Sequence, residues 1–185
     1  LALFYIDCRD QQLTVFPEGQ VTGRLMTNAG RTRSFGGEAS LLATLWRNLD
    51  LQVAYGYTRA TFVKFDTGKA DYAGNFIPYA PQHTLYAGAS YTLRTGWNCL
   101  EYVIFRVAAN GAGRIYWNEA NTFSQPFYAL LEASIRFEHR HWAVDVWGRN
   151  LTDTRYDTFY FMSIGNSFLQ RGRPRTFGVS LSITL

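Results

Sequence analysis

The segment 175–185 alternates without error between apolar side chains and small or polar ones. The apolar positions are Phe177, Val179, Leu181, Ile183 and Leu185. Because successive side chains of a strand point to opposite faces, this pattern predicts a β-strand with one apolar and one polar face. In a sequence built of similar segments, such a strand favours an antiparallel transmembrane β-barrel of the bacterial outer membrane.

The composition fits a barrel and excludes several other classes. Aromatic residues make up 17% of the 185 residues, as expected of a protein with aromatic girdles. No run of 18 apolar residues is present, which excludes a transmembrane helix. The formal charge of +4 is scattered through turns and loops, so we expect anionic lipid or an anionic ligand and no nucleic acid. Cys8 and Cys99 lack CxxC or metal spacing, and we expect them to be unpaired.

Eight strands are predicted, joined alternately by long polar loops and short turns. The strands span about 1–16, 31–46, 49–65, 79–93, 98–109, 127–138, 141–156 and 174–185, and short turns lie at 47–48, 95–96 and 139–140. Outer-membrane barrels have short turns on the periplasmic side and long loops outside. A tilted strand needs roughly 9–11 residues to cross a bilayer, so the predicted lengths suffice.

The sixth predicted strand shows how the two faces differ. One face carries Phe127, Ala129, Leu131, Ala133, Ile135 and Phe137, and the other carries Glu132, Ser134, Arg136 and Glu138. A charge on the lipid face costs about 2–4 kcal/mol near the midplane, so we expect the apolar face to point outward. The charged face then requires a wide lumen that is filled by water or a plug.

Tryptophans lie beside all three short turns, where they predict one level of an interfacial belt. These residues are Trp46, Trp97 and Trp142. We expect the opposite belt to consist of Tyr57, Phe62, Tyr116, Trp117 and Tyr156.

Three motifs resemble TonB-dependent outer-membrane receptors. They are the segment Asn28–Glu38, the segment Ile77–Leu85, and an Asn150-Leu151-Thr152-Asp153-x-x-Tyr156 element followed by Gly172-Arg173-Pro174-Arg175. The resemblance implies a plugged barrel of about twenty-two strands. Residues 1–185 would be the C-terminal part of its one β-barrel domain, supplying the last eight strands without the plug or the earlier strands. We therefore expect the chain to be a piece of a longer precursor. It ends in Leu185, whereas many family members end in Phe.

The resemblance implies a function in active transport. Such receptors take up scarce nutrients with energy supplied through TonB, and here we expect a ferric siderophore. The expected partners are TonB, through the missing N-terminal part, and the lipid and lipopolysaccharide around a multi-pass barrel. We expect no cofactor. Structural roles are expected for Asn150, Leu151, Thr152, Asp153, Tyr156, Pro174 and Arg175.

Ligand contacts are predicted only from charge and stacking at the external loops. The candidates for contact with a ferric chelate are Arg31, Arg33, Tyr72, Asn75, Gln170, Arg171 and Arg173. Alternatively, these residues are solvated or bind lipopolysaccharide. No catalytic residue or metal site is predicted, because His139 and His141 flank a solvated turn and no nucleophile motif is present.

Three other readings of the sequence remain open at this point. The first is a complete eight-stranded barrel that acts as an adhesin or structural anchor, with its first and last strands paired. The second is a barrel enzyme, which needs a catalytic set that we do not find. The third is a soluble β-sandwich, whose turns would have no sidedness.

Overall fold

The computed structural model describes residues 1–15, 25–28, 30–163 and 166–184, and the described part contains strands and no helix. No helix of the length and apolarity needed to cross a bilayer occurs in this part. The fourteen strands are β1 (Ala2–Arg9), β2 (Gln12–Val15), β3 (Leu25–Asn28), β4 (Arg31–Leu45), β5 (Leu49–Lys64), β6 (His83–Trp97), β7 (Leu100–Gly113), β8 (Ile115–Tyr116), β9 (Ser124–Gln125), β10 (Tyr128–His139), β11 (Trp142–Arg149), β12 (Asp157–Ser163), β13 (Asn166–Arg171) and β14 (Thr176–Ile183).

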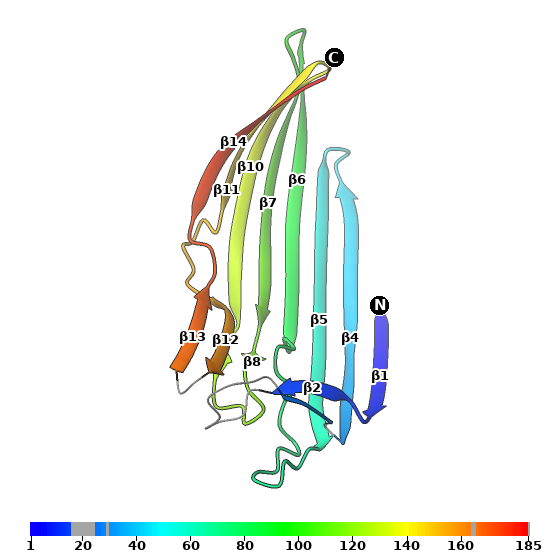
Figure 1. Ribbon diagram of the computed structural model, residues 1–185. Coiled ribbons are helices and arrows are strands. Elements are labelled where there is room, and N and C mark those ends of the chain that lie inside the picture. The colour runs from blue at the N-terminus through cyan, green and yellow to red at the C-terminus, as the bar shows by residue number, and fades with distance from the viewer. Residues whose placement is uncertain (16–24, 29, 164–165, 185) are drawn as a thin grey trace.

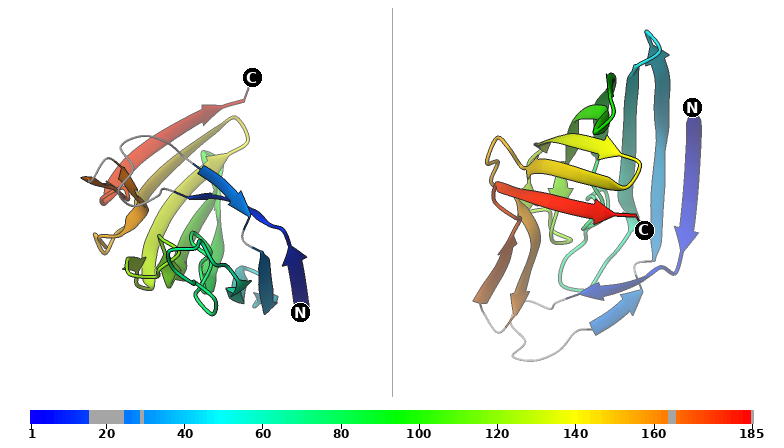
Figure 2. Two further views of the ribbon diagram at one scale, coloured as in Figure 1. Left: turned by 60° about the horizontal axis from the view of Figure 1, so that its bottom comes forward. Right: turned by 90° about the horizontal axis from the view of Figure 1, so that it is seen from above.

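Eight of these strands form one antiparallel sheet in the order β1-β4-β5-β6-β7-β10-β11-β14. Each of the eight pairs with the next in chain order, and the sheet curves like part of a barrel wall (Figures 1 and 2). Within the described residues, β1 and β14 are the two edges and do not pair. The eight strands therefore do not close on themselves, which contradicts the alternative of a complete small barrel.

The predicted sorting of connections by side is confirmed. The turns after β4, β6 and β10 are short and lie at one end of the sheet, while the long connections lie at the other (Figure 1). Each of three long connections also contains a two-stranded hairpin of its own, formed by β2-β3, β8-β9 and β12-β13. These hairpins were not predicted.

Several predicted strand boundaries are wrong because the backbone leaves the sheet earlier. The first strand ends at Arg9, since Asp10 takes a positive φ of 53° and the chain then enters β2. The seventh ends at Arg149, since Asn150 has a φ of 50°. The fourth begins at His83 rather than Tyr79, which itself has a φ of 63°. A positive φ is uncommon for residues other than Gly and is incompatible with continuing a strand.

The register confirms which side chains share a face. Ile135 lies opposite Phe105 and Val146, and Val146 lies opposite Val179, so one apolar row crosses four strands. The neighbouring row contains Arg136 opposite Asp145. We call the apolar side the outer face and the charged side the inner face. Val179 and Ile135 are 68% and 38% exposed, so the outer face has no protein cover among the described residues.

The small buried core lies at the loop end of the sheet and not between its faces. Phe62 and Phe65 are each 1% exposed, and Tyr72 and Ile77 pack against them. Phe62 and Trp117, which is 7% exposed, are therefore buried under loops. The prediction that these two residues belong to an interfacial belt is wrong.

The three tryptophans that were predicted beside the short turns do lie at the short-turn end. Trp46 is in the turn after β4, Trp97 ends β6, and Trp142 begins β11. Trp46 and Trp97 are 83% and 65% exposed. Cys8 and Cys99 are both free, as expected.

Candidate functional site

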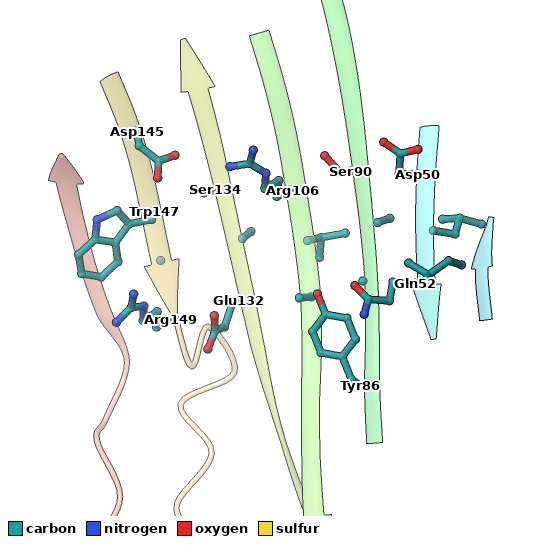
Figure 3. Close-up of a pocket in the computed structure, with 18 of the residues that line it drawn as sticks. Asp50, Gln52, Tyr86, Ser90, Arg106, Glu132, Ser134, Asp145, Trp147 and Arg149 are labelled. Carbon is teal, nitrogen blue, oxygen red and sulfur yellow. The ribbon is translucent and has the colours of Figure 1, made fainter. Parts of the chain in front are cut away.

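The polar side chains of the sheet surround a hollow of about 490 Å³ on the inner face (Figure 3). Its charged members come from four strands: Asp50 from β5, Arg106 from β7, Glu132 from β10, and Asp145 and Arg149 from β11. Acidic and basic groups are interspersed across the face (Figure 3). A surface of this kind favours a partner with many polar groups over a purely apolar one.

Trp147 is held flat against the inner face by three contacts. Its Nε1 donates a hydrogen bond of 3.2 Å to Oγ of Ser180, and the Arg149 guanidinium lies 4.8 Å from the ring centroid. Gly178 lies under the ring, because a Cβ added there would be 2.3 Å from Cζ2 of Trp147. The absence of a side chain at Gly178 therefore permits this position of the indole.

Asp145 has hydrogen-bonding capacity that its neighbours do not use. Arg136 lies opposite Asp145 in register, yet its Nε donates instead to Glu138, at 2.8 Å. Oδ1 of Asp145 is inaccessible to water and has no hydrogen-bond partner among the described residues. An unpaired buried acceptor is costly, so a donor from a segment packed on this face would be favourable.

The long connections pack together through aromatic rings at the loop end. Tyr79, which precedes β6, contacts Trp117 and stacks on Phe159 of β12, with centroid distances of 5.5 Å in both cases. Phe123 stacks on Tyr160 at 4.7 Å. These rings join three connections that are far apart in the sequence. Together they form one packed aromatic junction, which comprises Tyr79, Trp117, Phe123, Phe159 and Tyr160.

The environment of the Tyr79 hydroxyl sets the chemistry of this junction. The Tyr79 hydroxyl donates a hydrogen bond of 3.0 Å to the Tyr160 carbonyl. Burial, and secondarily the negative charge of Glu119, raises the pKa of Tyr79 above its ordinary value. The hydroxyl consequently stays protonated and able to donate throughout the neutral range.

Asparagine side chains add specific hydrogen bonds between the same connections. Asn121 accepts from the Phe76 backbone N–H at 2.7 Å and donates to the Phe76 carbonyl at 2.9 Å. Asn75 donates to the Glu119 carbonyl at 2.8 Å. Side-chain amides can replace a backbone partner in this way because they offer one acceptor and two donors.

The Asn150 element forms a hydrogen-bonded corner between β11 and β14. Asn150, 4% exposed, donates to the Thr154 and Arg173 carbonyls, both at 3.0 Å, and accepts from the Thr154 N–H at 2.8 Å. Asp153 accepts from the Arg175 N–H at 3.0 Å. These bonds connect the motif with the Gly-Arg-Pro-Arg segment.

Tyr156, the last residue of the motif, covers a glycine in that segment. A Cβ on Gly172 would be 2.0 Å from the Tyr156 ring, and the Gly172 N–H donates to the Tyr156 carbonyl at 2.8 Å. The ring of Tyr128 stacks on that of Tyr156 at a centroid distance of 4.5 Å.

The seven candidate ligand residues lie in three separate places. Tyr72 and Asn75 are in the connection after β5, where Tyr72 packs on Phe65 at 5.5 Å. Gln170 and Arg171 are exposed on β13, with Arg173 exposed just beyond it. Arg31 and Arg33 lie on the outer face of β4.

The outer-face position of the two arginines follows from their partners. Nε and Nη2 of Arg31 donate to the two Asp7 carboxylate oxygens at 2.8 and 2.6 Å, and Arg33 lies opposite Asp7. The Arg33 guanidinium lies 5.9 Å from the ring centroid of Tyr5, whose neighbour across the strands is Phe35. Their side chains therefore point away from the inner face, and this orientation does not support contact with a ligand in the lumen.

Several residues of the inner face and the junction were not singled out from the sequence. The inner face carries Asp50, Arg106 and Trp147. The period of two in each strand assigns them to this face once the register between the strands is known. Tyr79 contacts Trp117, which was predicted only as a belt residue, and Asn121 bonds to the Phe76 backbone; no local spacing signals these contacts between connections. Among the described residues, no group of three or more His, Cys, Asp or Glu side chains is placed to hold a metal ion.

Comparisons with known proteins identify relatives of the whole described sheet. A family model described as "TonB dependent receptor-like, beta-barrel" matches residues 1–151. The chain is 27% identical to the pesticin receptors of Yersinia pestis and Yersinia enterocolitica over 98% of its length. It spans only 26% of the length of these relatives.

Solved structures show the same fold. The crystal structure of the ferric yersiniabactin uptake receptor FyuA from Yersinia pestis superimposes with a TM-score of 0.80 at 23% identity, covering 98% of this chain and 26% of that one. That of BauA, the ferric preacinetobactin receptor from Acinetobacter baumannii, gives a TM-score of 0.70 at 19% identity, covering 97% of this chain and 26% of that one.

Proposed function

This chain belongs to the TonB-dependent receptor β-barrel family, and from that membership we propose that it forms part of the wall of an outer-membrane receptor that imports a ferric siderophore. The observation that carries the proposal is the register of the eight-stranded sheet. An apolar row crosses β7, β10, β11 and β14 on the outer face, charged side chains of β5, β7, β10 and β11 line the inner face, and the long connections lie at one end only. This is the arrangement that a transmembrane barrel with a polar lumen requires.

The chain accounts for about a quarter of such a receptor, as its 26% coverage of the relatives indicates. We propose that residues 1–185 are the C-terminal part of one barrel domain. A plug and a TonB-contacting segment would lie in the remainder of the protein. The inner face supports this view, because Oδ1 of Asp145 is buried with no donor in the described part of the chain and the hollow beside it is lined by charges. A plug segment would provide donors to these groups.

The proposed class of ligand follows from the relatives. The receptors to which the chain is similar are named for ferric yersiniabactin and ferric preacinetobactin. Arg side chains pair with anionic groups of a ligand, and aromatic side chains stack on cationic or aromatic ones. We propose that Tyr72, Asn75, Gln170, Arg171 and Arg173 form the external contacts of the chelate in this part of the wall.

The proposal specifies transport rather than catalysis, and uptake is therefore the activity to test. The test is accumulation of radioactive iron supplied as defined ferric siderophores, in cells that carry or lack the full receptor gene. We expect uptake of at least one chelate to depend on both the receptor and TonB. The proposal is contradicted if cells that lack the receptor gene take up every chelate as well as cells that carry it. It is also contradicted if uptake depends on the receptor and not on TonB.

A further inference from the structure

Three of the long connections are joined to one another, pair by pair, at the loop end of the sheet. They follow β5, β7 and β11 and span residues 65–82, 114–127 and 150–175. Their strands β8, β12 and β13 lie at the same end of the sheet (Figure 1). We call the described residues of these three connections the external rim.

The first and second connections are joined by hydrogen bonds and by a ring stack. The Asn121 side chain bonds to both the N–H and the carbonyl of Phe76, and the Tyr79 N–H donates to the Tyr116 carbonyl at 2.8 Å. The Phe76 ring stacks on that of Tyr116, with a centroid distance of 5.3 Å and 13° between the ring planes. If these connections moved apart, both backbone polar groups of Phe76 would lose their partner in Asn121.

The third connection is bonded to each of the other two. Oε1 of Gln125, a side chain in a residue that is 7% exposed, accepts a hydrogen bond of 2.9 Å from the Asp157 N–H. Phe123 stacks on Tyr160, and the Tyr79 hydroxyl donates to the Tyr160 carbonyl. The three connections thus form a closed set, in which one connection can leave only by breaking its contacts with both others.

Two residues at these contacts have a backbone conformation that residues other than Gly rarely adopt. Tyr79 has a φ of 63° and Asn121 a φ of 55°. Such a conformation costs free energy, above all for a bulky residue, and persists only where the surrounding contacts determine it. The backbone of the rim is therefore held by its contacts, as expected of a packed unit and not of independent loops.

The first connection is also fixed to the strand beneath it. It folds back on β5, where the Phe62 N–H donates to the Asn75 carbonyl at 2.9 Å and the Ile77 N–H donates to the Ala60 carbonyl at 3.0 Å. Phe62 and Phe65, each 1% exposed, form the buried core at this place. The rim is consequently attached to the sheet as well as to itself.

We propose that the external rim is one rigid unit that stays assembled while a ferric chelate is imported. The chelate enters the lumen beside the rim, through the part of the mouth that the rest of the barrel bounds, and the three connections do not separate to admit it. The statement about uptake rests on the proposed function. The rigidity does not, because it follows from contacts that exist without a ligand.

The first experiment asks whether the rim opens as one unit, in the full-length receptor in detergent micelles. Asn121→Gly removes both side-chain bonds to Phe76, and Gly readily adopts the φ of 55°. The matched control is Asp10→Gly, at an exposed residue with a φ of 53° in the connection after β1, outside the rim. Hydrogen exchange, measured by mass spectrometry, is compared in peptides that contain Asp157 of the third connection.

We expect exchange in the Asp157 peptides to become at least fivefold faster in Asn121→Gly and to change less than twofold in Asp10→Gly. A unit that opens as a whole transmits the weakening of one contact to all its members. Acceleration confined to 65–82 and 114–127 would overturn the rigid unit. Heat-modifiable electrophoretic mobility checks folding, and Asn75→Ala, which removes the bond to the Glu119 carbonyl, replaces Asn121→Gly if that variant does not fold.

The second experiment locks the rim and measures uptake by whole cells. Phe123→Cys with Tyr160→Cys replaces a stacked pair that joins two connections, and a bis-methanethiosulfonate reagent links the two thiols. The matched control, Phe161→Cys with Phe168→Cys, replaces a pair stacked at 4.9 Å within the β12-β13 hairpin. Both native cysteines are replaced by Ser. Mass spectrometry measures the linked fraction, and dithiothreitol removes the link.

The uptake probes are defined ferric siderophores, including ferric yersiniabactin and ferric preacinetobactin. We expect the linked receptor to import them within twofold of the same variant after dithiothreitol, because the link joins parts that do not separate. A loss of at least tenfold that dithiothreitol reverses, and that the linked control does not show, would overturn the inference.

The two experiments distinguish failure of this inference from failure of the proposed function. If the unlinked receptor imports a siderophore and the linked one does not, the rim opens during uptake, and the transport proposal stands. If the unlinked receptor imports none of them, the transport proposal fails, and hydrogen exchange alone decides whether the rim is one unit.

Discussion

The hydroxyl of Tyr79 donates a hydrogen bond of 3.0 Å to the carbonyl of Tyr160, a residue 81 positions later in the chain. Tyr79 leads into β6 and Tyr160 belongs to β12, so this one bond connects two external segments on different parts of the sheet. It lies within the aromatic junction. Three of the long connections are therefore packed on one another at the loop end of the sheet.

We predict that Tyr79→Phe loosens this packing without disrupting the barrel. The substitution removes the hydrogen bond to Tyr160 but keeps the ring that stacks on Phe159, so the expected cost is about 0.5–1.5 kcal/mol. Hydrogen exchange of the β12 amides should become several-fold faster, while exchange in β6 should not change. Tyr91→Phe, on the exposed outer face, is the control. Unaltered exchange in β12 would show that the bond contributes nothing to the packing.

The raised pKa of Tyr79 predicts a specific alkaline transition. Because burial favours the neutral phenol, the stability contributed by this residue is complete below the ordinary tyrosine pKa near 10 and is lost as pH rises through the folded-state value. The difference between the ultraviolet titrations of the unaltered receptor and Tyr79→Phe reports this one phenol. Its midpoint should lie above 10, and a midpoint at or below 10 would mean that the phenol is solvated.

We predict that Asn150→Ala strongly impairs folding of the barrel. It removes two donated and one accepted hydrogen bond from a side chain that is 4% exposed, and each buried group left without a partner costs about 1–3 kcal/mol. The urea midpoint of unfolding and the fraction of heat-modifiable protein should both fall. Asn48→Ala, in an exposed short turn, should leave both unchanged. Wild-type stability of Asn150→Ala would contradict the structural role of the corner.

We predict that Gly178→Ala displaces Trp147 from the inner face. The new methyl group would overlap the indole, so the ring must move and the bond from its Nε1 to Ser180 must break, at an expected cost of about 1–3 kcal/mol. The matched control is Ser182→Ala, four residues further along β14 on the same face. We expect Gly178→Ala to lose more stability than Ser182→Ala loses. Equal stability of the two variants would mean that Trp147 does not require the glycine.

Strand periodicity predicted the sheet well because each face is decided locally. Ile135 and Arg136 alternate along β10, and a period of two assigns them to opposite faces whatever their partners are. The strand ends were predicted less well, since they depend on single backbone conformations. Asp10 and Asn150 take positive φ values that their residue types permit but do not require.

The contacts across loops were beyond sequence reasoning for a different reason. The contact of Tyr79 with Trp117 depends on which connections are neighbours at the loop end. The ion pair of Arg31 with Asp7 depends on the pairing and register of β1 and β4. Arg31 and Arg33 illustrate the consequence. They were chosen as ligand candidates for their charge, and the prediction did not consider on which face of the sheet they lie. Their outward position changes the partner that their charge suits.

Our central claim is that the apolar face of this sheet contacts lipid while the charged face lines an occupied lumen. The most direct test places one spin label at each position from 176 to 183 in the full receptor in bilayers, with Cys8 and Cys99 replaced by Ser. Oxygen concentrates in the bilayer and speeds the relaxation of labels that contact lipid. The relaxation enhancement should vary along the strand with a period of two, with maxima at Phe177, Val179, Leu181 and Ile183. Maxima at Thr176, Gly178, Ser180 and Ser182, or a uniform profile, would contradict the claim.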